Sequence, residues 1–328
     1  MQVPMMSAVR YDGSHVRVEE VRRLRPASGE VLVRVAAVSV DRADAEPETG
    51  PWPVRLDATP SRTLGRHLSG TVAAPGVGVE GWPLGRTVVV QPEFGSRGSW
   101  LRLGVEHDGA LADYVSVPAR ALVPVPKGLE PSYAAQIVAA ARVDSMLEHA
   151  RLTAGESLGI WGGGALGAAA VVVARARGAA PIVVVDPDED ARAQGRDLGA
   201  DVCLDPHVPD FAEHVRESVG NDGLDVALHL APDARAAEQA LAALGPVGRG
   251  VLAGPARWVE SPRWDARTLS GVPPLDPAAL PRLLRLAALG RLVLPVRPRL
   301  DGGLGEAAHL LDTAARTGSG VRPFVVCL

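Results

Sequence analysis

The chain has 328 residues, 47% of them hydrophobic, which is enough to form a core in each of roughly two domains. Its net charge of −4 provides no excess of positive charge to neutralise phosphates, so we expect no nucleic-acid partner. The first residues do not resemble a signal peptide, and no apolar run reaches the roughly 20 residues that span a bilayer. The two cysteines, Cys203 and Cys327, are far apart, as in a reduced compartment. We expect a cytoplasmic protein with no membrane partner.

Residues 1 to about 125 are rich in short β-like runs separated by Gly, Pro and Asp turns, a spacing typical of a β-barrel or sandwich. These runs include "VRVEEV", "EVLVRVAAVSV", "SGTVAAPGVGV", "RTVVVQPE" and "ALADYVSVPA". From Pro131 onward, after an alanine-rich helix, strand-like and helix-like segments alternate, which predicts parallel βαβ units in a doubly wound sheet. The tail, from "LVLPVRPRL" to "GVRPFVVCL", returns to strand-like runs, and we expect it to rejoin the first domain.

A glycine-rich turn follows the strand-like "SLGIW" and reads Gly162-Gly163-Gly164-Ala165-Leu166-Gly167. In the pattern G-x-G-x-x-G, Gly162 allows the tight turn, Gly164 lets a pyrophosphate approach the backbone, and Gly167 lets helix and strand pack closely. The helix that follows presents unpaired N–H groups to the phosphates. Asp186 ends the next strand, where its carboxylate can bind an adenosine ribose and repel a 2′-phosphate. The pattern predicts a dinucleotide site that favours NAD(H), with NADP(H) possible. The alternative is a glycine turn with an acid that merely starts a loop.

Residues 39–46, "SVDRADAE", place three carboxylates and an arginine directly after the buried strand-like run 29–38. Such residues form either an ordinary solvated loop or a site held on a rigid element. The segment alone does not distinguish the two.

Together these segments resemble the medium-chain dehydrogenase/reductase superfamily over nearly the whole chain. The resemblance rests on "GEVLVRVAAVSV", "LGRHLSGTV", "GIWGGGALG", "LGAD" and the closing "VRPFVV". It is closest to the zinc alcohol dehydrogenase branch. The resemblance implies an α/β protein with a GroES-like β-barrel catalytic domain at 1–127 and 297–328 and a Rossmann doubly wound parallel-sheet domain at 128–296. Nicotinamide and a small-molecule substrate would meet between the domains, and a homodimer is expected.

The resemblance also locates the family's first two zinc-ligand motifs. The motif that resembles C-x-[ST]-D reads "DRAD" here, so Asp41 stands in place of the cysteine ligand. Ala43 replaces the hydroxyl that usually relays the alcohol proton. The motif that resembles G-H-E reads "GRH", so the histidine ligand has become Arg66.

The remaining zinc positions are also without ligands. The third ligand position falls near Val138, and the lobe at about 92–107 lacks the four cysteines of a structural zinc site. Because a catalytic zinc ion needs three N, S or carboxylate ligands, we predict that the protein binds no zinc.

Arg66 is expected to project into the space that zinc occupies in relatives, where it would face Asp41 and Asp44 in a guanidinium–carboxylate cluster. Arg66 would then support the developing oxyanion. His67 is the local titratable group, and Asp41 is the other candidate for handing a proton to a carbonyl oxygen. The alternative is a purely structural ion pair, with the proton coming from water. The resemblance assigns Arg42 to the cofactor pyrophosphate.

These features predict a zinc-independent, NAD(P)(H)-dependent oxidoreductase that moves a hydride between the nicotinamide and a small polar ketone or secondary alcohol. The acidic run suggests a cationic substrate, such as an amino sugar or cyclitol intermediate of specialised metabolism; its members are Asp41, Asp44, Glu46 and Glu48. Two alternatives stay open. One is a reductase of activated C=C bonds or quinones, and the other is a catalytically silent NAD-binding regulatory protein.

Overall fold

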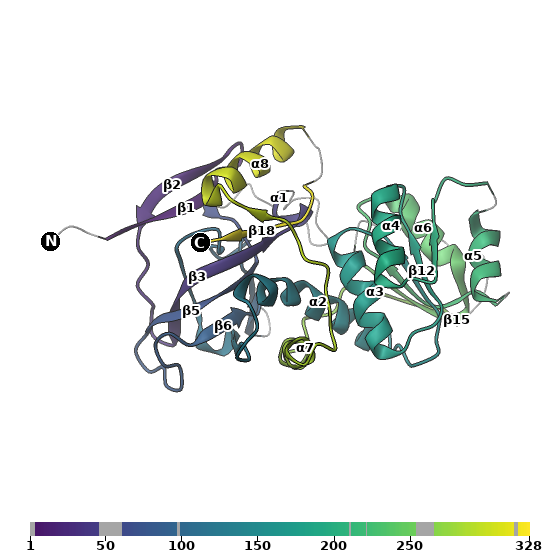
Figure 1. Cartoon of the computed structure of the whole chain (residues 1–328), viewed down its shortest axis with the longest axis horizontal. Helices are drawn as coiled ribbons and strands as arrows, with labels where there is room; N and C mark the ends of the chain where they lie inside the picture. The colour runs from purple at the N-terminus through teal and green to yellow at the C-terminus, as the bar shows by residue number, and fades with distance from the viewer. Residues whose placement is uncertain are drawn as a thin grey trace.

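The structure is a computed structural model that describes residues 4–45, 61–96, 99–209, 211–220, 222–253, 266–317 and 321–328. Two lobes lie side by side, a β-rich lobe that also receives the C-terminal strand and an α/β lobe (Figure 1). Glu46 and Glu48 of the predicted acidic run lie outside the described residues. No helix in the described ranges is both long and apolar enough to cross a membrane.

The β-rich lobe contains the strands β1 (Met5–Tyr11), β2 (Val16–Arg22), β3 (Glu30–Val40), β4 (Arg62–Thr63), β5 (His67–Pro75), β6 (Thr87–Val90), β7 (Glu93–Ser96), β8 (Ser99–Arg102), β9 (Tyr114–Pro118), β10 (Leu122–Pro124), β17 (Arg299–Leu300) and β18 (Phe324–Cys327). Its main sheet has the order β10-β6-β5-β3-β18-β17, with β9 also paired to β3. Smaller sheets have the order β2-β1-β4 and β7-β8. Most residues of β3 are buried, which explains its nearly continuous apolar sequence.

The α/β lobe contains the parallel strands β11 (Leu158–Trp161), β12 (Ile182–Val185), β13 (Val202–Leu204), β14 (Leu224–His229), β15 (Leu244–Leu252) and β16 (Thr268–Gly271). Its helices are α3 (Ala165–Arg177), α4 (Glu189–Leu198), α5 (Phe211–Val219) and α6 (Ala234–Ala243). The strand order is β13-β12-β11-β14-β15-β16, with β11 and β14 at the point where the winding reverses. Ligands of doubly wound sheets bind beyond the carboxyl ends of the strands at this point. The predicted fold class is confirmed.

Helix α2 (Pro131–His149) lies between the lobes and contacts β3 and β5 of one and α3 of the other. It also packs against α7 (Ala279–Ala288). Because it is covered on several sides, nearly all of its side chains are buried, and this accounts for its alanine-rich sequence. Among the buried residues of this helix, Arg142 and Asp144 carry charged side chains.

The tail rejoins the β-rich lobe through β17 and β18, as expected, but much of it is not strand. Pro295 and Pro298 interrupt the first strand-like run, because proline has no N–H to donate to a sheet. Between the two strands lies helix α8 (Gly303–Thr317), whose buried residues recur at helical spacing: Ala307, Ala308, Leu311 and Ala314.

Candidate active site

A cavity of about 670 Å³ lies between the lobes, with walls from both. The predicted site residues that line it are Asp41, Arg42, Arg66, His67, Gly162, Gly164, Ala165, Leu166, Gly167 and Asp186. Asp44 does not line it and lies behind Arg66. Residues that the sequence places in two separate regions therefore share one space.

The glycine turn has the geometry that a dinucleotide requires. Gly162 has a φ of +106°, a conformation that other residues rarely adopt. A Cβ on Gly167 would lie 2.0 Å from the carbonyl oxygen of Gly162, so only glycine lets α3 begin this close to the strand. A Cβ on Gly164 would meet no atom within 4 Å, because this residue faces open space. Helix α3 starts after Gly164 with no side-chain cap, which leaves N–H groups for an anion.

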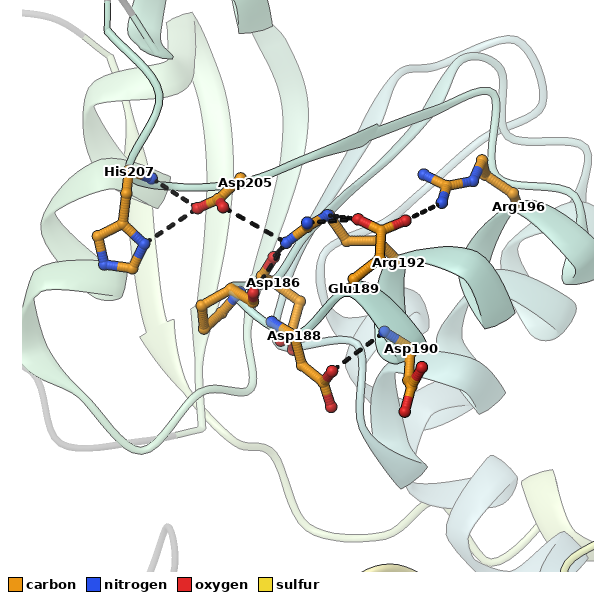
Figure 2. A network of polar contacts seen from close by, with 9 residues as sticks. Asp186, Asp188, Glu189, Asp190, Arg192, Arg196, Asp205 and His207 are labelled. Atoms are coloured by element: carbon orange, nitrogen blue, oxygen red, sulfur yellow. Dashed lines mark hydrogen bonds and ion pairs between the residues drawn. The ribbon is translucent and has the colours of Figure 1, made fainter.

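Asp186 lies immediately after β12, at the nucleotide end of the cavity. Its Oδ2 accepts a hydrogen bond from the backbone N–H of Gly163 at 2.6 Å, and its Oδ1 accepts one from that of Asp188 at 2.8 Å. Arg192 donates to the backbone carbonyl of Asp186 at 2.7 Å and lies 3.6 Å from the carboxylate of Asp205 (Figure 2). Carboxylates outnumber guanidinium groups in this network (Figure 2). A doubly charged phosphate would therefore meet like charge here.

Two arginines of the β-rich lobe, Arg42 and Arg322, line the cavity. Arg42 begins the short helix α1 (Arg42–Ala45). Arg322, just before β18, also lines the cavity, and its guanidinium lies 3.2 Å from the carboxylate of Asp190 on α4. Arg322 was not predicted as a site residue, because no local sequence pattern relates it to Asp190, which precedes it by 132 residues.

At the other end of the cavity, Arg66 contacts both predicted carboxylates. Its Nη2 lies 3.2 Å from Oδ1 of Asp41, and its Nε lies 3.3 Å from Oδ1 of Asp44. Backbone groups fix the carboxylates, since Asp44 accepts from the N–H of Asp41 and Asp41 accepts from the N–H of Ala43, each at 3.0 Å. Hydrogen bonds from Arg66 and from the backbone N–H groups therefore hold the two carboxylates in one arrangement.

A second arginine, Arg297, supports this cluster and was not predicted. Its Nη1 donates to the hydroxyl of Ser39 at 2.6 Å, and its charge acts on Asp41 and Asp44. Burial lowers the pKa of Arg297, and the two carboxylates oppose that shift. Arg297 is 258 residues from Ser39, so only the return of the tail to the β-rich lobe brings them together.

The two carboxylates titrate differently although they are three residues apart. Burial raises the pKa of Asp44 to about 6, and the neighbouring charge of Asp41 adds to the rise while Arg66 opposes it. Burial also acts to raise the pKa of Asp41, but the charges around it, above all Arg66, hold that pKa below 3.8. The pair therefore offers one firmly ionised carboxylate on the cavity wall and one proton-binding carboxylate behind it.

His67 differs from the sequence expectation. Burial lowers the pKa of His67 to about 3, although the nearby Asp41, with Nδ1 and Oδ2 3.9 Å apart, opposes the shift. The imidazole is therefore neutral near pH 7 and is not the local titratable group. Asp44 has the pKa closest to neutrality in this cluster.

The side chains at this position do not fit a catalytic zinc ion. The guanidinium of Arg66 lies against both carboxylates, and its charge would repel a dication. Val138 of α2 is fully buried and has no ligand atom. Within the described ranges, no three His, Cys, Asp or Glu side chains are grouped so that they could hold a metal. The absence of zinc itself stays a prediction.

Three further charged residues line this end of the cavity and were not singled out from the sequence: Glu93 of β7, Arg102 of β8 and Arg142 of α2. Arg142 donates to the carboxylate of Glu93 and, at 2.9 Å, to the carbonyl oxygen of Pro273. The Nε of Arg102 donates to the carboxylate of Glu106 at 3.0 Å. These residues lie on separate elements, so their proximity could not be inferred from spacing.

Comparisons with known proteins agree with this geometry. Residues 27–127 match the family model described as alcohol dehydrogenase GroES-like domain, and residues 165–263 match the one described as zinc-binding dehydrogenase. L-threonine 3-dehydrogenase from Pyrococcus furiosus is 33% identical over 250 residues, which cover 72% of this chain and 71% of the relative. 2-Dehydro-3-deoxy-L-galactonate 5-dehydrogenase from Pseudoalteromonas atlantica is 29% identical over 261 residues, 75% of each chain.

Solved structures share the whole fold. An alcohol dehydrogenase from E. coli in complex with NADH superimposes with a TM-score of 0.86 at 17% identity, covering 99% of both chains. A dehydrogenase from Sinorhizobium meliloti bound to NADP has a TM-score of 0.84 at 24% identity, covering 99% of this chain and 100% of the other. The chain thus belongs to the zinc-binding alcohol dehydrogenase family of the medium-chain dehydrogenase/reductase superfamily and is an alcohol dehydrogenase-type oxidoreductase.

Proposed function

We propose that this protein is a zinc-independent dehydrogenase that transfers a hydride between a nicotinamide cofactor and a small polar secondary alcohol or ketone. The observation that carries the proposal is the place of Arg66. Its guanidinium is held by Asp41 and Asp44 on the cavity wall, at the motif position of a zinc ligand. A fixed positive group can stabilise the negative charge that develops on a substrate oxygen, as a metal ion does in relatives.

NAD(H) is the favoured cofactor in this proposal, with NADP(H) as the alternative. Solved structures of similar fold contain either NADH or NADP. The acidic surroundings of Asp186 support NAD(H), because they disfavour a 2′-phosphate (Figure 2). The glycine turn would hold the pyrophosphate, and Arg42 and Arg322, which also line the cavity, would contact its negative charge. When bound, the nicotinamide ring accepts or donates the hydride.

The chain itself would position the substrate and handle its proton. In alcohol oxidation the substrate oxygen lies against Arg66, and the ionised carboxylate of Asp41 accepts the hydroxyl proton. Loss of that proton and of the carbon-bound hydride together produce the ketone. Asp44 does not reach the cavity and acts by fixing Arg66. In ketone reduction the same groups act in reverse.

The proposal assigns residues 1–127 and 297–328 to the catalytic domain and residues 128–296 to the nucleotide-binding domain. Both contribute walls to the cavity, which supports this division. The homodimer stays a prediction from the resemblance, as does the location in the cytoplasm.

A direct test combines cofactor binding with turnover. The protein is treated with a zinc chelator, dialysed, and mixed with NAD⁺ and a panel of small secondary alcohols, and in reverse with NADH and ketones, enones and quinones. We expect oxidation of alcohols at a rate that neither the chelator nor added zinc changes. Tight NADH binding without turnover of any acceptor would contradict the proposal and support the silent regulatory alternative, whereas turnover of enones alone would support the C=C reductase.

A further inference from the structure

The substrate end of the cavity contains more buried positive charge than the proposed hydride transfer requires. Arg66 suffices for the oxyanion, yet Arg142 also faces the cavity from the middle of α2. Only 8% of Arg142 is exposed, and the helix around it is otherwise mostly small and apolar. Burial of a guanidinium is unfavourable unless it is paired, so its presence on such a helix needs a reason.

A purely structural role explains Arg142 poorly. Its contacts with Glu93 and with the carbonyl oxygen of Pro273 connect α2 to β7 and to the segment before α7. An apolar pair of similar volume usually stabilises a core at least as well as a buried ion pair does. Both members of this pair line the cavity, where a substrate can contact them.

The charges on the wall favour an anionic ligand. Among the described residues that line this end, the guanidinium groups are those of Arg66, Arg102 and Arg142, and the carboxylates are those of Asp41 and Glu93. Two further carboxylates, Asp44 and Glu106, contact these arginines but do not line the cavity. Each of the three arginines has a carboxylate partner, and the asymmetry lies in position: all three arginines line the cavity, whereas two of the four carboxylates do not.

This arrangement opposes the cationic substrate suggested by the acidic run. Asp41 and Asp44 face Arg66 and are acted on by Arg297, so their charges are matched within the protein. A cationic substrate would compete with those arginines for the carboxylates. Arg142, which also lines the cavity, can instead contact an anionic group.

We propose that the substrate of this enzyme is a short hydroxy acid or the matching keto acid, whose carboxylate is held by Arg142 while its alcohol or ketone oxygen lies at Arg66. The inference rests on the proposed function and names its substrate class. The planar guanidinium can hold a carboxylate through two parallel hydrogen bonds, and the contact with Glu93 sets its orientation. Arg102, the cross-strand neighbour of Glu93 at the end of β8, also lines the cavity, with its guanidinium paired to Glu106.

The test uses ligands that match in shape and differ in charge. Butanoate, butanamide and butylammonium are titrated separately into the protein by calorimetry, with and without NAD⁺. We expect butanoate to bind at least about tenfold more tightly than butanamide, and butylammonium to bind most weakly, because the amide and the ammonium cannot form the charge-assisted pair. Arg142→Met should abolish the preference, and Arg142→Lys should keep part of it.

Controls separate recognition from folding. Arg316→Met removes an exposed arginine that is paired with Asp312 at 3.0 Å, and it should leave the preference unchanged. The double variant Glu93→Gln/Arg142→Met avoids a stranded carboxylate and should lose the preference as fully as Arg142→Met does. Circular dichroism verifies that each variant is folded.

Kinetics distinguish this inference from the proposed function. With NAD⁺, kcat/KM for 3-hydroxybutanoate should exceed that for 2-butanol at least about tenfold, and Arg142→Met should raise KM for the acid with little change in kcat. Equal binding of butanoate and butanamide, or a preference that survives Arg142→Met, would overturn the inference even if 2-butanol is oxidised. If neither alcohol reacts but butanoate still binds through Arg142, the carboxylate site stands and the proposed dehydrogenase function fails.

Discussion

Replacement of Arg66 by methionine is the sharpest test of the proposed mechanism. The change keeps an unbranched side chain and removes the guanidinium that lies 3.2 Å from Asp41 and 3.3 Å from Asp44. If Arg66 stabilises the substrate oxyanion, its removal mainly raises the free energy of the transition state relative to that of the bound substrate. Loss of one oxyanion donor typically lowers kcat about 10²–10³-fold, or roughly 2.7–4 kcal/mol. The Kd for NADH should change little, because Arg66 lies at the substrate end.

The same change should also destabilise the fold, and the structure bounds the effect. Removal of one partner from a buried ion pair typically costs about 3–5 kcal/mol. Here Arg297 remains to oppose the charge of Asp41, and Asp44, whose pKa is already about 6, can take up a proton. We therefore expect the free energy of unfolding to fall by about 3 kcal/mol, near the lower end of that range.

The assay must separate the two effects. We would measure kcat and the Kd for NADH well below the Tm of each variant, and the free energy of unfolding in urea. Arg66→Lys should recover only part of the rate, because an ammonium lacks the planar fork. The double variant Arg66→Met/Asp44→Asn should be more stable than Arg66→Met, because no carboxylate at position 44 is left without its arginine, but it should keep the low kcat. If Arg66→Met folds and turns over at the native rate, Arg66 does not replace the metal.

Three further outcomes test other parts of the site. Metal analysis of the purified protein should show no stoichiometric zinc, and one zinc ion per chain would overturn the assignment of Asp41 and Arg66 to the ligand positions. Asp186→Ser should narrow or reverse a preference for NADH over NADPH in kcat/KM, and a strong native preference for NADPH would contradict the role of Asp186. Because burial raises the pKa of Asp44 from 3.8 to about 6, the native state keeps a proton that the unfolded chain has lost. Between pH 4 and pH 7 the wild type should therefore lose up to about 3 kcal/mol of unfolding free energy relative to Asp44→Asn, as measured by urea unfolding at each pH. If the unfolding free energies of the two proteins change equally with pH, the pKa of Asp44 is not raised in the folded state.

The dinucleotide turn and the strand pattern were predictable from the sequence because their causes are local. Within six residues, Gly162 provides a positive φ, Gly167 allows the close approach of helix and strand, and Gly164 leaves open space beside the backbone. The alternation of strands and helices after Pro131 is likewise a matter of neighbouring residues, and it implies the parallel sheet. The secondary structure of the tail was harder to predict, because prolines end a strand-like run whose composition alone favours β structure.

The contacts of the site depended on tertiary structure. The sequence indicated Asp41, Asp44 and Arg66 through their motif positions, but Arg297 and Arg142 join them from distant segments without any motif. The protonation states of Asp41 and Asp44 could not be predicted from the sequence either. Burial acts to raise the pKa of both aspartates, and the neighbouring positive charges outweigh it at Asp41 but not at Asp44, because desolvation and Coulomb energies depend on distances in space. The sequence by itself therefore determined the fold class and the nucleotide turn, whereas only the folded chain decided which charges meet around the substrate.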